Sequence, residues 1–205
     1  LGYAESIETN SSLPEEVQQK ASLIKCQGIR LRNLVNDLNL MTRLEDIGKV
    51  NRQELFQPVI FCRELMASFL NNEIPDSFSV EFYLDKSLAS IKLQGDKHLL
   101  QRAIHNLLYN CIKHNPDGCK IHFSASRGLD HVLFIVSDNG KGMVTDEISL
   151  LKIRSQYLTG SELFHDKQHG FGLYIVQQIV KMHAGKIHFK KNLLGGLDAI
   201  MHLPI

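Results

Sequence analysis

The sequence predicts an α+β protein: a two-layer α/β sandwich with a mixed sheet, preceded by a partial helical hairpin. Two observations lead to this prediction. Residues 1–46 show helical periodicity, whereas residues 47–205 combine helical segments with strand patterns that come in pairs. The pattern changes near Gly48, and we therefore expect a helical hairpin domain at 1–46 and a second domain at 47–205.

The composition limits the classes of function. A chain of 205 residues with 43% apolar side chains can bury one core and a smaller element. A formal net charge of +1 gives no support for binding through bulk charge, and we expect no nucleic-acid partner. The cysteines form no CxxC pair and have no zinc-ligand spacing with histidine, which favours reduced thiols. No apolar run approaches the roughly 20 residues of a membrane-spanning helix.

The first domain has the pattern of two helices. Residues 1–9 resemble the end of a helix. A second helix is expected to start with Ser12 as its cap and Pro14 in its first turn. Amphipathic packing within its own domain is one interpretation of this second helix, and we favour a hairpin that forms a four-helix bundle with a second copy. The positions that alternate by four and three residues, as in a heptad seam, are Val17, Ala21, Ile24, Gly28, Leu31, Val35 and Leu38.

The second domain alternates strands and helices. A helix is expected at 58–72, another is capped by Asp96 and includes 105–114, and a third follows Gly170. Residues 144–169 fit neither pattern, and so long a loop in a compact domain is usually a lid or a binding element. Strands are expected at 49–56, 79–85, 90–95, 120–126, 131–138, 186–192 and 199–204.

Three polar residues mark the helix that contains HNLLYNCIKH. Asn106, Asn110 and Lys113 are spaced by four and three residues, so they share one helical face. Asparagine oxygens suit Mg²⁺ that is held mainly by phosphates and water, and a lysine can neutralise phosphate charge. The alternative is a solvated polar face, which becomes the weaker interpretation once the two glycine loops downstream are considered.

The first glycine loop is DNGKG, directly after the strand at 131–138. Asp138 can accept a hydrogen bond from the exocyclic amine of adenine, where guanine presents a carbonyl group. Gly140 and Gly142 can let the backbone approach a base closely. A plain turn is the alternative for this segment alone.

The second glycine loop is GFGL, where Gly170 and Gly172 precede a helix. The free N–H groups of a first helical turn, together with the helix dipole, favour phosphate oxygens. A glycine hinge at the start of a helix is the structural alternative. We predict a nucleotide pocket from three features together: the helix that contains Asn106 and Asn110, the DNGKG loop and the GFGL loop.

In this order the motifs closely resemble the ATP-binding domain of bacterial sensor histidine kinases, members of the gyrase/chaperone/kinase/mismatch-repair ATPase superfamily. The resemblance covers almost the whole chain. It identifies HNLLYNCIKH, DNGKGM and HGFGLYIV as the N, G1 and G2 boxes, and NLVNDLNLMTRLE as part of the dimerisation and phosphotransfer hairpin. The fold it implies is the histidine kinase ATPase fold.

The resemblance also implies roles for individual residues. Asn110 would coordinate Mg²⁺ with help from Asn106, and Lys113 and His114 would contact phosphate or ribose. Asp138 would bind adenine. The other positions of the ATP site implied by the motifs are Gly140, Gly142, Met143, Gly170, Phe171, Gly172 and Leu173. Arg154 or Lys167 could add positive charge from the lid.

The chain departs from the family at several positions. The phosphoacceptor histidine with its acidic neighbour is expected before Leu1, because no histidine present has that context. Gln168 replaces the first glycine of many G2 loops, no F box appears within 144–169, and Leu197 replaces the usual threonine after the last glycine pair. These departures concern lid closure and catalytic efficiency more than nucleotide binding.

The resemblance implies a fragment of a protein-histidine kinase of a two-component system. It would bind ATP and Mg²⁺, form a homodimer through the hairpin and act with a cognate response regulator. We expect a cytoplasmic domain of a membrane-anchored sensor. One alternative is a degenerate nucleotide-binding or scaffold module of the same fold, and another is an ATP-driven clamp of the gyrase or chaperone type.

Overall fold

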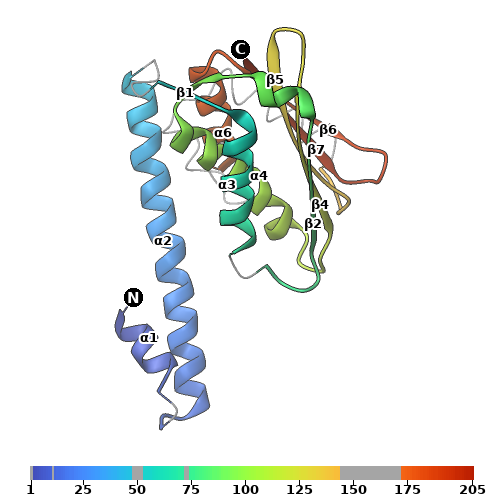
Figure 1. The fold of residues 1–205 in the computed structure, drawn as a ribbon. Coiled ribbons are helices and arrows are strands. Elements are labelled where there is room, and N and C mark those ends of the chain that lie inside the picture. The colour runs from blue at the N-terminus through green and yellow to red at the C-terminus, as the bar shows by residue number, and fades with distance from the viewer. Residues whose placement is uncertain (1, 11, 48–52, 72–73, 144–171) are drawn as a thin grey trace. The chain divides into compact units, whose positions relative to one another are not determined.

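The computed structural model describes residues 2–10, 12–47, 53–71, 74–143 and 172–205 (Figure 1). The chain divides into two compact units, Leu1–Arg43 and Leu44–Ile205. We call them the helical unit and the α/β unit and describe each by itself. Gly48, where the sequence pattern changes, lies outside the described residues.

The helical unit is built from two helices, α1 (Gly2–Glu8) and the much longer α2 (Glu15–Ile47), most of which belongs to this unit. An ion-pair cluster joins them. The Lys25 ammonium lies 2.8 Å from a carboxylate oxygen of Glu8 and 3.3 Å from one of Glu5. These contacts raise the pKa of Lys25, mainly through its hydrogen bond to Glu8. The hairpin expected from the sequence is therefore present.

The predicted cap of the second helix at Ser12 is wrong. α2 begins at Glu15, and the first carbonyl to accept is that of Pro14, from the Val17 N–H at 2.9 Å. The Ser12 hydroxyl and N–H both donate to the side chain of Asn10. Asparagine side chains readily accept hydrogen bonds from residues close in sequence, so Asn10 holds Ser12 in the turn between the two helices.

The heptad seam of α2 remains largely uncovered within the helical unit. Ala21 is buried, with 3% of its surface exposed. Ile24 and Leu31 are 65% and 63% exposed, and Val35 is about half exposed. An apolar stripe of this kind is the surface that a helical bundle buries against another pair of helices.

The α/β unit contains a five-stranded mixed sheet of order β2-β4-β5-β7-β6. β2 pairs with β4 in parallel, and the other neighbours are antiparallel. β1 and β3 pair antiparallel with each other, apart from this sheet. The strands are β1 (Glu54–Phe56), β2 (Ser79–Leu84), β3 (Leu93–Gly95), β4 (Lys120–Arg127), β5 (His131–Asp138), β6 (Lys186–Lys191) and β7 (Leu197–Pro204).

Three helices cover one face of the large sheet: α3 (Pro58–Leu70), α4 (Lys97–His114) and α6 (Gly172–Met182) (Figure 1). A short 3-10 helix, η1 (Lys86–Ser90), precedes β3. Residues alternate between buried and half-exposed along β5, as expected when one face of a sheet packs against helices. Phe123 and Phe134 point to the helices and are buried. The two-layer α+β sandwich predicted from the sequence is confirmed.

The start of α4 is fixed by contacts that join three elements. Asp96 caps the helix as predicted, accepting from the N–H groups of His98 and Leu99 at 2.9 and 3.1 Å. His183, at the end of α6, accepts from the Asp96 N–H at 3.0 Å and contacts the Ile179 carbonyl at 2.7 Å. A side chain at Gly95 would overlap the His183 ring, which explains the glycine.

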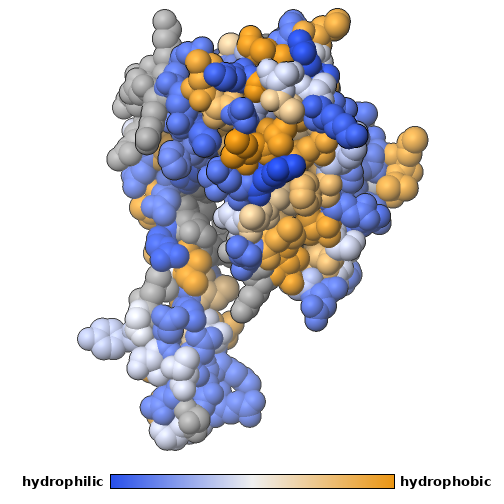
Figure 2. Space-filling model, viewed as in Figure 1, coloured by the Kyte–Doolittle hydropathy of each residue, from blue (hydrophilic) through white to orange (hydrophobic). Residues whose placement is uncertain are grey.

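Part of the surface of the α/β unit is apolar. Figure 2 shows apolar side chains gathered on the side of the unit where α3 and β2 lie. The large apolar residues of these two elements that remain exposed are Ile60, Leu70, Phe82 and Tyr83. Across the described ranges, every helix is too short or too polar to cross a bilayer.

Candidate nucleotide-binding site

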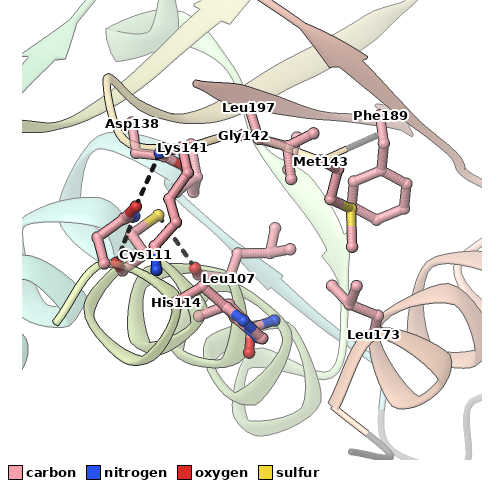
Figure 3. Close-up of a pocket in the computed structure, with 14 residues that line it drawn as sticks. Leu107, Cys111, His114, Asp138, Lys141, Gly142, Met143, Leu173, Phe189 and Leu197 are labelled. Carbon is pink, nitrogen blue, oxygen red and sulfur yellow. Dashed lines mark hydrogen bonds between the residues drawn. The ribbon is translucent and has the colours of Figure 1, made fainter. Parts of the chain in front are cut away.

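A cavity of about 260 Å³ opens between α4, the loop after β5, and the strands β6 and β7 (Figure 3). Both polar and apolar side chains line it. The lining residues are Leu107, Asn110, Cys111, His114, Asn115, Val136, Asp138, Lys141, Gly142, Met143, Leu173, Phe189, Leu197 and Ala199. A mixed lining of this kind, with a few convergent polar groups, is typical of sites for small organic ligands.

The last turns of α4 supply one wall. Asn110 and His114 line the cavity, one helical turn apart. Lys113 is exposed and is not part of this lining. Asn106 lies one turn earlier and donates to the Gly172 carbonyl at 3.4 Å, so it connects α4 to the first residue of α6.

Asp138 supplies the buried charge of the cavity. It is the last residue of β5 and only 8% of its surface is exposed. One carboxylate oxygen accepts from the Gly140 N–H at 2.9 Å. A carboxylate in so sheltered a position has little water to bond, so a ligand donor placed against it gains a strong interaction.

A cysteine lies beside this carboxylate. Burial raises the pKa of the Cys111 thiol, and the negative charge of Asp138 raises it further. The pKa of Cys119 is also raised by burial and by Asp138. Both thiols are therefore neutral at pH 7. Neither of these two thiols therefore competes with the Asp138 carboxylate as a charged acceptor.

The turn between β6 and β7 closes against the loop that follows Asp138. The Asn192 amide donates to the Asp138 carbonyl at 2.7 Å and to an Asp198 carboxylate oxygen at 3.1 Å. Gly142 has a φ of 68°, and a side chain there would overlap the Gly195 carbonyl. The glycine at 142 is thus required both by its conformation and by close backbone contact.

The structure brings together part of the predicted site. The cavity is lined by Asn110, His114, Asp138, Gly142, Met143 and Leu173. Outside its lining lie Asn106, Lys113, Gly140 and Gly172. Not described by the structure are Gly170 and Phe171, together with Arg154, Lys167, Gln168 and the rest of the 144–171 segment.

Sequence reasoning missed several lining residues. Cys111 and Asn115 flank the predicted residues of α4, and Lys141 lies within the DNGKG motif itself. Helical periodicity could have placed Leu107 and Cys111 beside Asn110 and His114. Val136 precedes Asp138 by two residues on β5, so strand alternation could have placed it on the same face. Phe189 and Ala199 come from β6 and β7 and carry no local signal.

A family match identifies the class of domain to which this fold and cavity belong. Residues 95–205, more than half of the chain, match the family described as "Histidine kinase-, DNA gyrase B-, and HSP90-like ATPase". The chain belongs to this family. The predicted resemblance to sensor histidine kinases is confirmed by relatives that bear that name.

The sensor histidine kinase YvrG of Bacillus subtilis (strain 168) is 27% identical over 190 residues, which cover 91% of this chain and 32% of YvrG. The chain thus spans about a third of the length of this relative. The fold is similar to that of ShkA in complex with AMPPNP, with a TM-score of 0.74, 19% identity and coverage of 100% of this chain and 42% of ShkA. It is also similar to that of the histidine kinase ThkA in complex with the response regulator TrrA (TM-score 0.70, 18% identity, coverage 99% and 55%).

Proposed function

We propose that the chain binds ATP with Mg²⁺ and transfers the γ-phosphoryl group to a histidine that precedes Leu1 in the parent protein. In this proposal residues 47–205 form the catalytic domain and residues 1–46 part of the dimerisation and phosphotransfer hairpin. The observation that carries the proposal is the buried Asp138 carboxylate in the wall of a cavity that Asn110 and His114 also line. Family membership and the AMPPNP bound to ShkA support the choice of ATP.

Asp138 would recognise the base. Its carboxylate can accept a hydrogen bond from the adenine amine, and guanine offers no donor at that position. The apolar lining residues Leu107, Val136 and Leu173 provide surface on which a base can pack. Because Cys111 and Cys119 stay protonated, Asp138 is the charged acceptor of this part of the cavity.

The phosphate groups would lie along the wall that α4 supplies, near Asn110. Asn110 offers an amide oxygen there, and the described residues contain no group of three or more His, Cys, Asp or Glu side chains placed to hold a metal. Such a site fits Mg²⁺ that takes most of its ligands from phosphates and water, with Asn110 and Asn106 as protein ligands. Bound Mg²⁺ would neutralise charge on the β- and γ-phosphates, and Lys113 and His114 would contribute further positive charge or hydrogen bonds.

The transfer itself would need mainly positioning and charge neutralisation. A histidine nitrogen attacks the γ-phosphorus in line, a new N–P bond forms, and the bond to the β-phosphate oxygen breaks as ADP leaves. No histidine of this chain has the sequence context of the acceptor. We therefore expect the chain to phosphorylate a supplied hairpin in trans and not itself.

Calorimetric titration with ATP and GTP, each with and without Mg²⁺, tests the proposal. We expect adenine-selective binding that Mg²⁺ strengthens. Asp138→Asn should weaken ATP binding by roughly 1–3 kcal/mol, because it removes a charged hydrogen-bond acceptor. Equal ATP affinity of the wild type and this variant would contradict the adenine assignment.

The proposed partners are a second copy of the chain and a cognate response regulator. The exposed seam of α2, which includes Ile24 and Leu31, supports the homodimer. The complex of ThkA with its response regulator supports the second partner. We also propose that the parent protein is a membrane-anchored sensor and that this part of it lies in the cytoplasm, in keeping with relatives named as sensors.

A degenerate module that binds nucleotide weakly and works through protein contacts is the second candidate. The departures at Gln168 and in the F box motivate it. Leu197, where the resemblance implies a threonine, adds an apolar side chain to the cavity lining. Absence of ATP binding would support it. A clamp ATPase is the third candidate, and hydrolysis without transfer to a histidine would favour it over a kinase.

A further inference from the structure

Asn115 joins two parts of the cavity wall that are far apart in sequence. It is the C-terminal cap residue of α4 and only 5% of its surface is exposed. Its amide nitrogen donates to the Cys111 carbonyl in the last turn of α4 at 2.8 Å. Its amide oxygen accepts from the Lys141 N–H at 3.0 Å, 26 residues further along the chain (dashed lines in Figure 3).

Gly140 fits closely against this amide. A Cβ atom added at Gly140 would overlap the side-chain oxygen and the amide carbon of Asn115. The backbone at Gly140 has no positive φ in the range that disfavours other residues. The space occupied by Asn115 is therefore what requires a glycine at this position.

These contacts fix the loop that begins with Asp138. Asn115 holds the loop at Lys141, while Asn192 holds its start at the Asp138 carbonyl. The Gly140 N–H in turn donates to the Asp138 carboxylate, so the position of Gly140 sets the direction in which that carboxylate points. A residue that served only as the C-terminal cap of α4 would form hydrogen bonds with that helix and none with the loop.

We propose that Asn115 is a positioning residue for base recognition: it anchors the Asp138–Gly142 loop to α4 and so aims the Asp138 carboxylate at the adenine amine. This inference rests on the proposed function. The residue contacts neither the base nor the phosphates in this role. It sets the orientation of the Asp138 carboxylate. This carboxylate favours adenine only when it is aligned with the adenine amine.

Loss of Asn115 should therefore affect adenine selectivity and leave the Mg²⁺ effect on nucleotide binding intact. Without Asn115 the loop loses its attachment at Lys141 and keeps those at Asp138 and Asn139, so the carboxylate is less well aligned and the preference for adenine over guanine falls. The residues of α4 that serve the phosphate end, such as Asn110, keep their helix. The strengthening of nucleotide binding by Mg²⁺ therefore survives, whereas a general loss of structure would reduce selectivity and the Mg²⁺ effect together.

The test is calorimetric titration of Asn115→Ala with ATP and GTP, with and without Mg²⁺. We expect the ratio of ATP to GTP affinity to fall about tenfold, the effect of losing a hydrogen bond that orients a charged group. The factor by which Mg²⁺ strengthens ATP binding should stay within about twofold of the wild type, well below the change in the ratio. Asn71→Ala, at an exposed asparagine after α3, is the matched control and should change neither quantity.

Gly140→Ala provides an independent variant, because its methyl group would displace the Asn115 amide. We expect it to reduce selectivity in the wild-type background and to have much less effect when Asn115 is already alanine. Additive effects of the two substitutions would overturn the inference. So would an Asn115→Ala protein that retains the wild-type ratio of ATP to GTP affinity, or one that loses the Mg²⁺ effect in parallel.

Different results would overturn the proposed function and the role of Asn115. A wild-type chain that binds neither nucleotide overturns the proposed function and this inference with it. A wild-type chain that prefers ATP, together with an Asn115→Ala variant that prefers it equally, overturns the inference alone.

Discussion

The two units of this chain treat their apolar side chains in opposite ways. In the α/β unit, Leu108 and Phe123 are completely buried between helices and sheet. In the helical unit, Ile24 and Leu31 are almost two-thirds exposed although they follow a regular heptad spacing. Burial of apolar surface is the main driving force of folding. The α/β unit obtains this stabilisation from its own core, and the exposed residues of α2 contribute little of it within the helical unit.

The α/β unit buries its own apolar residues, whereas the helical unit leaves its apolar seam exposed. The α/β unit closes its own core and holds a cavity fixed by buried polar contacts. The seam of α2 has the spacing of a bundle helix but leaves most of its apolar surface uncovered within its own unit. We expect changes in the first unit to alter folding and ligand binding, and changes in the second to alter association.

Ile24→Asp should have the largest effect and acts on association. If the α2 seam forms the dimer, each copy loses a buried isoleucine worth roughly 1.5–3 kcal/mol, so the dimer is weakened by about 3–6 kcal/mol. Analytical ultracentrifugation of wild type and variant measures the change. Leu129→Asp, at a leucine that is 98% exposed in the β4–β5 turn, is the control and should leave the dimer intact. A dimer of unchanged stability in the Ile24→Asp variant would contradict the expectation that the α2 seam controls association.

Leu108→Ala tests the buried side of the comparison. The side chain is fully enclosed, so its truncation should lower the free energy of unfolding of the α/β unit by about 2–5 kcal/mol. Urea unfolding followed by circular dichroism measures this. Leu31→Ala in α2 should change the unfolding of the α/β unit by no more than ~0.5 kcal/mol. Similar losses from both variants would show that the units do not fold independently.

His183 makes the stability of the α/β unit depend on pH. Burial lowers the pKa of its imidazole below the ordinary value of 6.5, opposed by its contacts with the Ile179 carbonyl and with Asp96. The neutral ring accepts from the Asp96 N–H, and the protonated ring cannot. The unfolded chain therefore binds more protons, so this contribution is complete above pH 6.5 and is lost as the pH falls through the lowered value.

His183→Gln removes this titration while leaving the other histidines in place. Its unfolding free energy should be lower by about 1 kcal/mol at pH 7.5, through loss of the buried hydrogen bonds. The difference from wild type should shrink between pH 7 and pH 5, as measured by urea unfolding at each pH. A difference that grows towards acid would contradict the assigned direction.

Ala184→Gly should give the smallest effect, with the opposite sign. Ala184 follows α6 with a φ of 53°, a left-handed conformation that costs alanine energy and glycine almost none. The variant should be more stable by roughly 0.5–1 kcal/mol, visible as a higher melting temperature. Ala67→Gly, at an exposed position inside α3, should instead destabilise the protein by about 1 kcal/mol.

Contacts between residues close in sequence were easier to predict than contacts between distant residues. The cap at Asp96 involves only N–H groups two and three residues further along the chain, and it is present as expected. The cap at Ser12 failed because Asn10, two residues away, competes for the same side chain. The separate pairing of β1 with β3 brings together residues such as Glu54 and Gly95, and no local pattern specifies it.

The same division applies to the cavity. Asn110 and Asp138 stand in motifs whose residue types and spacing indicate their chemistry. Asn115 and Asn192 act through contacts that span 26 and 54 residues, so their sequence neighbours contain no sign of them. An asparagine that holds a distant loop looks in sequence like any asparagine of a turn.

The place of β7 in the sheet has a consequence for the making of the protein. This strand lies between β5 and β6, and it contributes Leu197 and Ala199 to the cavity. During synthesis from the N-terminus it is the last strand of the sheet to leave the ribosome, and until then β6 has no strand to pair with. Nascent chains that carry α4 and the Asp138 loop thus lack a finished cavity, and a ligand of this cavity can stabilise the domain only after translation of β7.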